Sequence, residues 1–409
     1  MMTATFGRLA DGPVQNAPGL MTQEITGSRD VARLRSGSKK SIPPGLRRRR
    51  SDFLHEPIWY KRLLWRLRED SQFLRSVVQY SFLLLCTWIG VEFCFFMQWG
   101  MDGGSGSITP RPPGVEGFLP ISALMSLKHY LSTGIINAIH PAALSILVAI
   151  LLASLLVKKA FCSWLCPIGT LSESLWLLGQ KIFGRNLILP RWFDYSLRSL
   201  KYLLLAFFLW SILAMDTSSL ERFIYSPYNK VADIKMYLFF AQISGVALGT
   251  ILVLIALSVV IKNFWCRFLC PYGALLGVVS LLSPLKITRI KSTCIDCEKC
   301  TKACPSNIKV HEVTRVWSDE CMSCMACVEV CPVKNTLNMQ RSQTSRPIPT
   351  WVLGTLVVGV FMAVTGLAMI TGHWQNGISR VEYQRRFLHL DDAQYQHFRG
   401  QAADYGPND

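Results

Sequence analysis

Eight of the fourteen cysteines form two runs with the same spacing. CIDCEKCTKACP begins at Cys294, CMSCMACVEVCP begins at Cys321, and both have the form C-x2-C-x2-C-x3-C-P. In this form three thiolates on a tight loop bind one cubane iron–sulfur cluster, and the fourth reaches across to a second cluster. Zinc sites can reuse C-x2-C, but two complete copies with both prolines favour two [4Fe–4S] clusters. The expected ligand sets are Cys294, Cys297, Cys300 and Cys331 for one cluster, and Cys321, Cys324, Cys327 and Cys304 for the other.

Four further cysteines form a repeated motif whose chemistry the sequence leaves open. KKAFCSWLCPIGTLSE and KNFWCRFLCPYGALLG both contain Cys-x3-Cys-Pro-x-Gly. At this spacing on a helix the two sulfurs share one face, and a duplication could bring all four together at the inner membrane surface. They could form a further metal or cluster site, a redox-active thiol pair, or structural thiols in a turn that docks the ferredoxin module. The four residues are Cys162, Cys166, Cys266 and Cys270.

Two ionisable residues suggest a second functional region, at the opposite side of the membrane. Glu92 falls in the outer half of an apolar block, and an ionisable group at that depth is a functional hypothesis by default. It could accept protons from a quinol bound near the outer face, where His129 also falls. The alternative is a carboxylate that reaches the interface or is capped by a neighbouring helix. No phosphate-binding glycine motif or nucleophile elbow occurs, so no self-contained catalytic site for an ordinary metabolite is predicted.

The apolar residues that must position these groups are concentrated in blocks. Half of the residues are hydrophobic, and the blocks are long enough to cross a bilayer about 30 Å thick. The net charge of +17 gathers beside alternate blocks, which indicates membrane topology and not nucleic-acid binding. The five predicted spans are Val77–Gln98, Ile135–Val157, Leu203–Met215, Met236–Ile261 and Trp351–Gly372, of which Leu203–Met215 is the weakest.

We therefore expect a mostly α-helical, polytopic membrane protein with about five transmembrane helices and an inserted two-cluster bacterial-ferredoxin (α+β) module. The positive-inside rule places the N-terminus and the ferredoxin module in the cytoplasm, and the C-terminus outside the inner membrane. Four domains are predicted. They are a disordered basic arm with an interfacial helix at 1–74, a four-span membrane domain at 75–284, the ferredoxin domain at 285–346, and a fifth span with an external tail at 347–409.

The arrangement from about Val77 to Leu337 resembles the NosR/NapH-type membrane polyferredoxins. The resemblance rests on the duplicated CxxxCP motifs, the two ferredoxin motifs, and the stretch RPPGVEGFLPISALMSLK at Arg111–Lys128. It implies electron passage between the quinone pool, or a cytoplasmic donor, and a partner redox protein, often for a periplasmic reductase or its maturation. The large flavin-binding domain of NosR is missing, so a flavin-bearing partner subunit is a candidate. The basic arm and the fifth span set the chain apart from a minimal NapH.

Three functions are consistent with these features. The leading one is an electron-transfer subunit of a respiratory chain that works in a complex. The second is a maturation factor that supplies electrons to a metal centre during assembly, like the CcoG-type relatives. The third is a redox-sensing membrane regulator. Because ten Lys and Arg face six Asp and Glu in the ferredoxin segment Lys286–Arg346, its net charge suits an acidic carrier such as flavodoxin.

Overall fold

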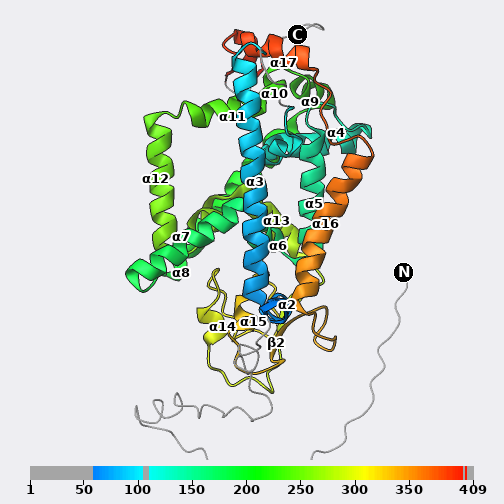
Figure 1. Cartoon of the computed structure of the whole chain (residues 1–409). Coiled ribbons are helices and arrows are strands. Elements are labelled where there is room, and N and C mark those ends of the chain that lie inside the picture. Colours follow the sequence, from blue (N-terminus) through cyan, green and yellow to red (C-terminus); the bar gives the residue numbers. More distant parts are fainter. Residues whose placement is uncertain (1–58, 105–109, 399–400, 403–409) are drawn as a thin grey trace, which may run out of the picture. The chain divides into compact units, whose positions relative to one another are not determined.

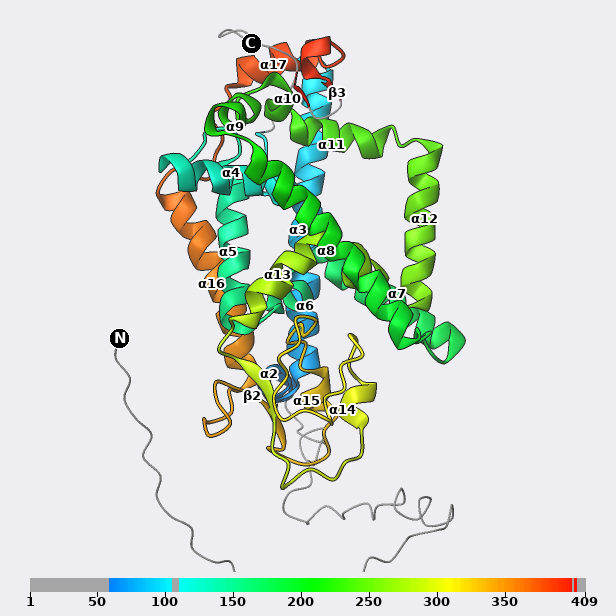
Figure 2. The same ribbon diagram turned by 180° about the vertical axis from the view of Figure 1, so that it is seen from behind.

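The structure is a computed structural model that describes residues 59–104, 110–398 and 401–402, and it is mostly helical (Figures 1 and 2). The predicted disordered arm lies outside the described residues. The predicted interfacial helix is confirmed as a helix, α2 (Trp59–Glu69), with Trp59, Leu63 and Leu64 exposed.

Three helices are long and apolar enough to cross a membrane. They are α3 (Ser71–Met101), α8 (Arg191–Ala214) and α16 (Thr350–Ile370), which cover the first, third and fifth predicted blocks. α8 begins before the weak apolar run because its first turns bury their charges. Asp194 accepts from Arg267, and Lys201 pairs with Glu320. Lys201 is therefore buried in a salt bridge.

The second predicted block forms α5 (Pro141–Val157), which starts six residues later than expected. Its N-terminal boundary has a local cause. The Asn137 carboxamide oxygen accepts from the backbone N–H groups of Ile139 and His140, and this turn competes with helix formation. Pro141 then occupies the first helical position, where its fixed φ is favourable and its missing N–H costs nothing.

The fourth predicted span, Met236–Ile261, is not one continuous helix. The segment forms two helices, α11 (Ala232–Ala241) and α12 (Gly245–Val260), which meet at 82° (Figure 1). Ser244 ends the continuity because its hydroxyl accepts from the N–H of Ala247 and starts a new helix. A hydropathy window does not detect such a cap, because the sequence on both sides is equally apolar. By length and composition, the described residues hold three spanning helices, or four if the bent pair is one span.

The repeat seen in the sequence is also a structural repeat. α5 is followed by the short helix α6 (Ala160–Trp164) and then α7 (Pro167–Phe183). α12 is followed by the π-helical turn η3 (Trp265–Leu269) and then α13 (Pro271–Leu281). In both copies the second cysteine caps the last helix of the unit.

The ferredoxin segment is built on a small antiparallel sheet. β1 (Lys286–Arg289) pairs with β2 (Leu337–Gln340), with Ile287 opposite Met339. The short helices α14 (Lys299–Lys302) and α15 (Ala326–Glu329) each follow one cysteine loop. The core is continuous with the membrane helices, because Ile287, Val316 and Leu337 belong to the same buried cluster as Trp164 of α6 and Leu353 of α16.

The remaining elements lie around the ends of the long helices (Figure 2). Residues 113–133 form a 3-10 turn and a helix that pack on α5. These elements are η2 (Pro113–Phe118), α4 (Pro120–Thr133), α9 (Thr217–Ile224), α10 (Pro227–Lys230), α17 (Arg380–Leu388), η4 (Ala393–Tyr395), β3 (His397–Phe398) and β4 (Gln401–Ala402).

Candidate electron-transfer site

The eight ferredoxin cysteines line two separate cavities, each with four cysteines from both motifs. The two cavities have the same small volume, about 20 Å³. Cys331 of the second motif lines the cavity of the first motif, and Cys304 of the first motif lines the cavity of the second. The grouping is the crossed one that the spacing predicts. The peripheral cavity holds Cys294, Cys297, Cys300 and Cys331, and the buried cavity holds Cys304, Cys321, Cys324 and Cys327.

The loops around these cavities keep a backbone shape that their residue types do not favour. Asp296 and Glu298 have positive φ in the first loop, and Ser323 and Met325 have positive φ at the matching positions of the second. Such conformations cost free energy for residues other than glycine, and they concentrate where a loop must wrap around a bound group.

The cavities fit a group with several irons better than they fit zinc. Across the described ranges, no three His, Cys, Asp or Glu side chains lie close enough together to hold a single metal ion. Four thiols that surround a space, instead of meeting at a point, are the donor set that a cubane cluster needs. A bound [4Fe–4S] cluster would supply one-electron redox chemistry there.

The two cavities differ in exposure. In the buried cavity Cys304, Cys321 and Cys327 are each less than one tenth exposed, whereas all four cysteines of the peripheral cavity are partly exposed. Burial raises the pKa of the Cys304 thiol to about 12, so iron binding there must displace a proton. At the peripheral cavity Arg289 donates to the sulfur of Cys294 at 3.2 Å.

The loop that carries the buried cavity is fixed to the end of α5 and to α6. Lys158, Ser163 and Trp164 donate to backbone carbonyls of residues 318–323, at 2.7, 2.5 and 3.1 Å respectively. In return, the hydroxyl of Ser323 donates to the carbonyl of Val157 at 3.0 Å. The CxxxC segment of the first repeat is therefore in direct contact with the second ferredoxin motif.

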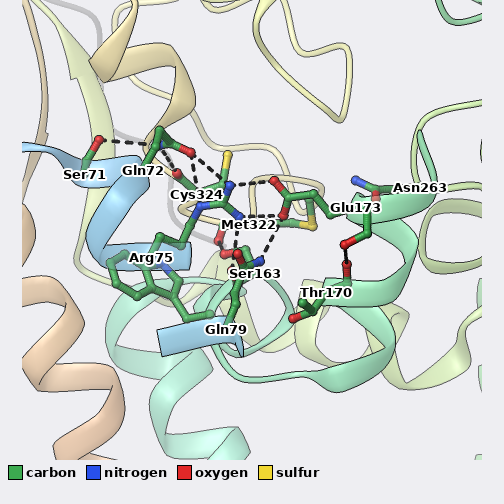
Figure 3. A network of polar contacts seen from close by, with 12 residues as sticks. Ser71, Gln72, Arg75, Gln79, Ser163, Thr170, Glu173, Asn263, Met322 and Cys324 are labelled. Atoms are coloured by element: carbon green, nitrogen blue, oxygen red, sulfur yellow. Dashed lines mark hydrogen bonds and ion pairs between the residues drawn. The ribbon is translucent and has the colours of Figure 1, made fainter. Parts of the chain in front are cut away.

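A second set of polar contacts joins the start of α3 to the same loop (Figure 3). Gln72 donates to the carbonyl of Cys324 at 2.9 Å, and Arg75 forms a bidentate pair with Glu173 of α7 at 2.6 Å. Burial opposes the charged carboxylate, but the hydrogen bonds and charge of Arg75 hold the pKa of Glu173 below its ordinary value. These residues were not predicted from the sequence, although an arginine directly before a predicted span was an available signal.

The two CxxxCP motifs have matching cap geometry. Cys166 caps α7 and accepts from the N–H of Gly169 at 3.4 Å, while Cys270 caps α13 and accepts from the N–H of Gly273 at 3.3 Å. The glycine of the first motif is required by space, because a Cβ there would lie 2.1 Å from the carbonyl oxygen of Cys162. The motif is thus a helix start that is capped by its second cysteine, with the first cysteine close to that cap.

The structure also brings the cysteines of the two motifs together. Burial, and then the neighbouring thiols of Cys270, Cys166 and Cys162, raise the pKa of Cys266 well above its ordinary value. Burial raises the pKa of Cys162 to about 11, opposed by the charge of the buried Lys159. The thiols of the two motifs therefore lie near enough to raise one another's pKa values. Whether they bind a cluster or act as thiols remains a prediction.

A third cavity of about 550 Å³ lies among α3, α5 and α16. Its lining is mainly apolar and includes Glu92, the predicted proton-accepting residue, and Arg111. Phe161 and Pro167, which flank the first CxxxCP motif, line the same cavity. His129 does not line it. The imidazole of His129 is buried within α4 and hydrogen-bonds the carbonyl of Ile135 at 3.1 Å.

Comparison with known proteins supports this assignment of the cysteine regions. The family model for a 4Fe–4S dicluster domain matches residues 288–339, and the model for a 4Fe–4S binding domain matches residues 139–186 and 244–289. The "Putative electron transport protein YccM" of Escherichia coli is 44% identical over 329 residues, which are 79% of this chain and 92% of that protein. The chain belongs to the NapH-type membrane polyferredoxin family.

More distant members resemble this polyferredoxin over a smaller region. The "Ferredoxin-type protein NapH" of Escherichia coli is 26% identical over 183 residues, 42% of this chain and 59% of NapH. "Protein NirI" of Paracoccus denitrificans is 27% identical over 170 residues, 40% of this chain and 24% of NirI. No solved structure matches the chain. The polyferredoxin is thus a ferredoxin-type electron-transport protein with 4Fe–4S domains and apolar helices typical of membrane proteins.

Proposed function

We propose that this chain relays electrons through two [4Fe–4S] clusters between the quinone pool and a partner redox enzyme. The carrying observation is the pair of equal cavities, each lined by three cysteines of one motif and the fourth cysteine of the other. Cys294, Cys297, Cys300 and Cys331 hold one cluster in this proposal. Cys304, Cys321, Cys324 and Cys327 hold the second.

The proposed path of the electrons runs from the buried cavity to the peripheral cavity. Hydrogen bonds from Lys158, Ser163 and Trp164 keep the buried cavity against the membrane helices. The peripheral cavity is partly exposed, and basic residues such as Lys299 and Lys302 lie on the adjacent α14. A soluble acidic carrier such as flavodoxin, or a flavin-bearing partner subunit, would exchange electrons there.

Cys162, Cys166, Cys266 and Cys270 are the proposed link between the buried cavity and the membrane interior. In favour of a third cluster, both copies of the motif fall within the matched 4Fe–4S binding model. Redox-active thiol chemistry is the alternative for these four cysteines. We keep the cluster as the proposal, because a duplicated pair of capped cysteines presents four thiols from two helix starts.

The membrane orientation completes the proposal. The N-terminus and the ferredoxin domain, 285–346, lie in the cytoplasm, and the C-terminal tail lies outside the inner membrane. Counted as one span, the bent pair α11 and α12 belongs to the proposed four-span membrane domain at 75–284. Quinol is the proposed membrane-side donor, because the apolar cavity among α3, α5 and α16 reaches the first CxxxCP motif at Phe161 and Pro167.

The test is anaerobic iron and sulfide content, followed by EPR during a dithionite titration. Wild type is compared with a variant in which all four CxxxCP cysteines are changed to serine. Eight irons in both proteins support two clusters and assign the CxxxCP cysteines to thiol chemistry or structure. More than eight in wild type, falling to eight in the variant, supports a third centre. Fewer than eight in wild type contradicts the relay.

Single variants test the crossed ligand sets. Cys304→Ser should change the EPR signal of the buried cluster, although Cys304 belongs to the first motif. Cys331→Ser should change the signal of the peripheral cluster. The opposite pairing of variants and signals would contradict the assignment.

A further inference from the structure

A buried charged cluster closes the end of the cavity among α3, α5 and α16. Its centre is Arg111, which starts the RPPGVEGF stretch and lines the cavity. The Arg111 Nη1 group donates to Glu116 at 2.9 Å, and Nε donates to Asp233 of α11. All three side chains are buried, and the second oxygen of Glu116 accepts from the N–H of Ala143 at 3.0 Å. The cluster therefore joins the η2 turn, the start of α5 and α11.

One donor in this cluster has no acceptor. The Nη2 group of Arg111 is buried and has no hydrogen-bond partner among the described residues. A buried guanidinium donor without an acceptor carries a desolvation cost that a native structure normally avoids. Because Arg111 lines the cavity, a molecule in the cavity can supply the missing acceptor.

The charge of the cluster limits what that molecule can be. One guanidinium faces two carboxyl side chains and donates to both. The imidazole of His140 lies beside them. Its Nε2 lies 2.8 Å from the carbonyl oxygen of Asn229, which can only accept, so Nε2 carries a hydrogen. Its Nδ1 faces Glu116 at 3.6 Å, too far for a hydrogen bond.

The cavity thus offers one strong donor whose guanidinium is already paired with two carboxyl side chains outside the lining. Glu92 places a carboxyl group in the lining itself, so a phosphate or other anion is less suited to the cavity than a neutral molecule with an acceptor oxygen. The lining is otherwise mainly apolar and partly aromatic, with Phe82, Phe361 and Trp374, and it suits a flat hydrophobic body.

We propose that Arg111 is the head-group anchor of a quinone-class ligand, whose oxygen accepts from Arg111 Nη2 in the cavity among α3, α5 and α16. This inference rests on the proposed function for its ligand class, and it names the residues that bind it. Glu116 and Asp233 are positioning residues. They hold the guanidinium in place and cancel its charge, so that it acts as a directional donor and not as an anion site.

The test is direct binding of a short-chain quinone to the full-length protein in detergent, measured by equilibrium dialysis with quenching of tryptophan fluorescence as a second signal. We expect saturable binding to wild type. Arg111→Gln should weaken it at least tenfold, because a hydrogen bond from a charged donor is lost. Arg386→Gln is the control, because Arg386 is also a buried arginine, paired with Glu382, but does not line the cavity.

A second variant covers the case in which Arg111→Gln does not fold, since it leaves two buried carboxylates without their counter-charge. Thr365→Phe fills the cavity from α16 and keeps the charged cluster. Gly366→Phe places the same side chain on the next residue, where a Cβ meets nothing within 4 Å. We expect Thr365→Phe to weaken quinone binding at least tenfold and Gly366→Phe to leave it unchanged.

The outcomes separate this inference from the relay. Iron content and EPR are measured on the same samples. Full iron content with no quinone binding, or with binding equal in all variants, would overturn the anchor and leave the relay. Arg111-dependent binding with fewer than eight irons would support the anchor and contradict the relay. Arg111-dependent binding of phosphatidylglycerol in place of quinone would also overturn the inference.

Discussion

The two CxxxCP glycines occupy the same position in the repeat but have different surroundings, so the same substitution should have different effects. A Cβ on Gly169 would lie 2.1 Å from the carbonyl oxygen of Cys162. A Cβ on Gly273 would lie 3.4 Å from the carbonyl oxygen of Cys266, an ordinary contact. The first carbonyl is 1.3 Å closer than the second, and because it is backbone it cannot rotate away.

The expected magnitudes follow from this difference. Overpacking of a well-packed site costs about 1–3 kcal/mol, and a contact this close with backbone belongs at the upper end. Alanine recovers up to about 1 kcal/mol of helix propensity relative to glycine. Gly169→Ala should therefore lower the free energy of unfolding by about 2 kcal/mol. Gly273→Ala should change it by less than about 1 kcal/mol, in the stabilising direction.

The assay is thermal unfolding of the detergent-solubilised variants, with iron content measured in parallel. Because the displaced carbonyl belongs to Cys162, Gly169→Ala should also move that thiol and reduce the retention of any metal bound by the four CxxxCP cysteines. Equal melting temperatures for the two variants, or a lower one for Gly273→Ala, would refute the reasoning.

Three further predictions concern how the elements are held together. Lys201→Met should destabilise the protein by roughly 3 kcal/mol, because it removes a buried partner of Glu320, whereas the same change at an exposed lysine should have little effect on the melting temperature. Gly179→Ala should disrupt the crossing of α7 and α12, because its Cβ would lie 1.9 Å from a backbone carbonyl oxygen of α12. A Cβ at Gly249 in α12 meets nothing within 4 Å, so Gly249→Ala should be neutral in the same melting assay. Trp164→Phe should lower the free energy of unfolding by about 1 kcal/mol, because it removes one hydrogen bond to the second ferredoxin loop. Protease should also cleave that loop faster in the variant. An unchanged cleavage rate would contradict the role of this contact in docking.

The features that the sequence predicted well depend on local patterns. The cysteine spacing predicted which four cysteines line each ferredoxin cavity, because the loop between neighbouring cysteines is short. The apolar blocks located α3, α8 and α16, and the sequence repeat corresponds to two helix starts that are each capped by the second cysteine of a motif. Each of these predictions uses only the types of residues that are close together in the sequence.

What the sequence did not predict depends on contacts between distant segments. The break at Ser244 is a single capping hydrogen bond inside an apolar run, and hydropathy is insensitive to it. Arg111 and Asp233 are separated by more than one hundred residues, so their pairing could not be inferred from spacing. Glu92 lines the cavity among α3, α5 and α16. His129, chosen because it fell near the same face, does not line it and hydrogen-bonds the carbonyl of Ile135, just beyond the end of α4.

The shared core of the ferredoxin segment and the membrane helices has a consequence for the order of synthesis. Ile287, Val316 and Leu337 pack in one cluster with Leu353 and Val357 of α16, which follows them in the chain. The cysteine loops are therefore synthesised before the helix that completes their core. Final closure of the core around the buried cavity must wait until α16 has been made and has packed against α5. If a cluster binds in that cavity, its insertion has a window during biogenesis, after translation of the second motif and before the last helix packs.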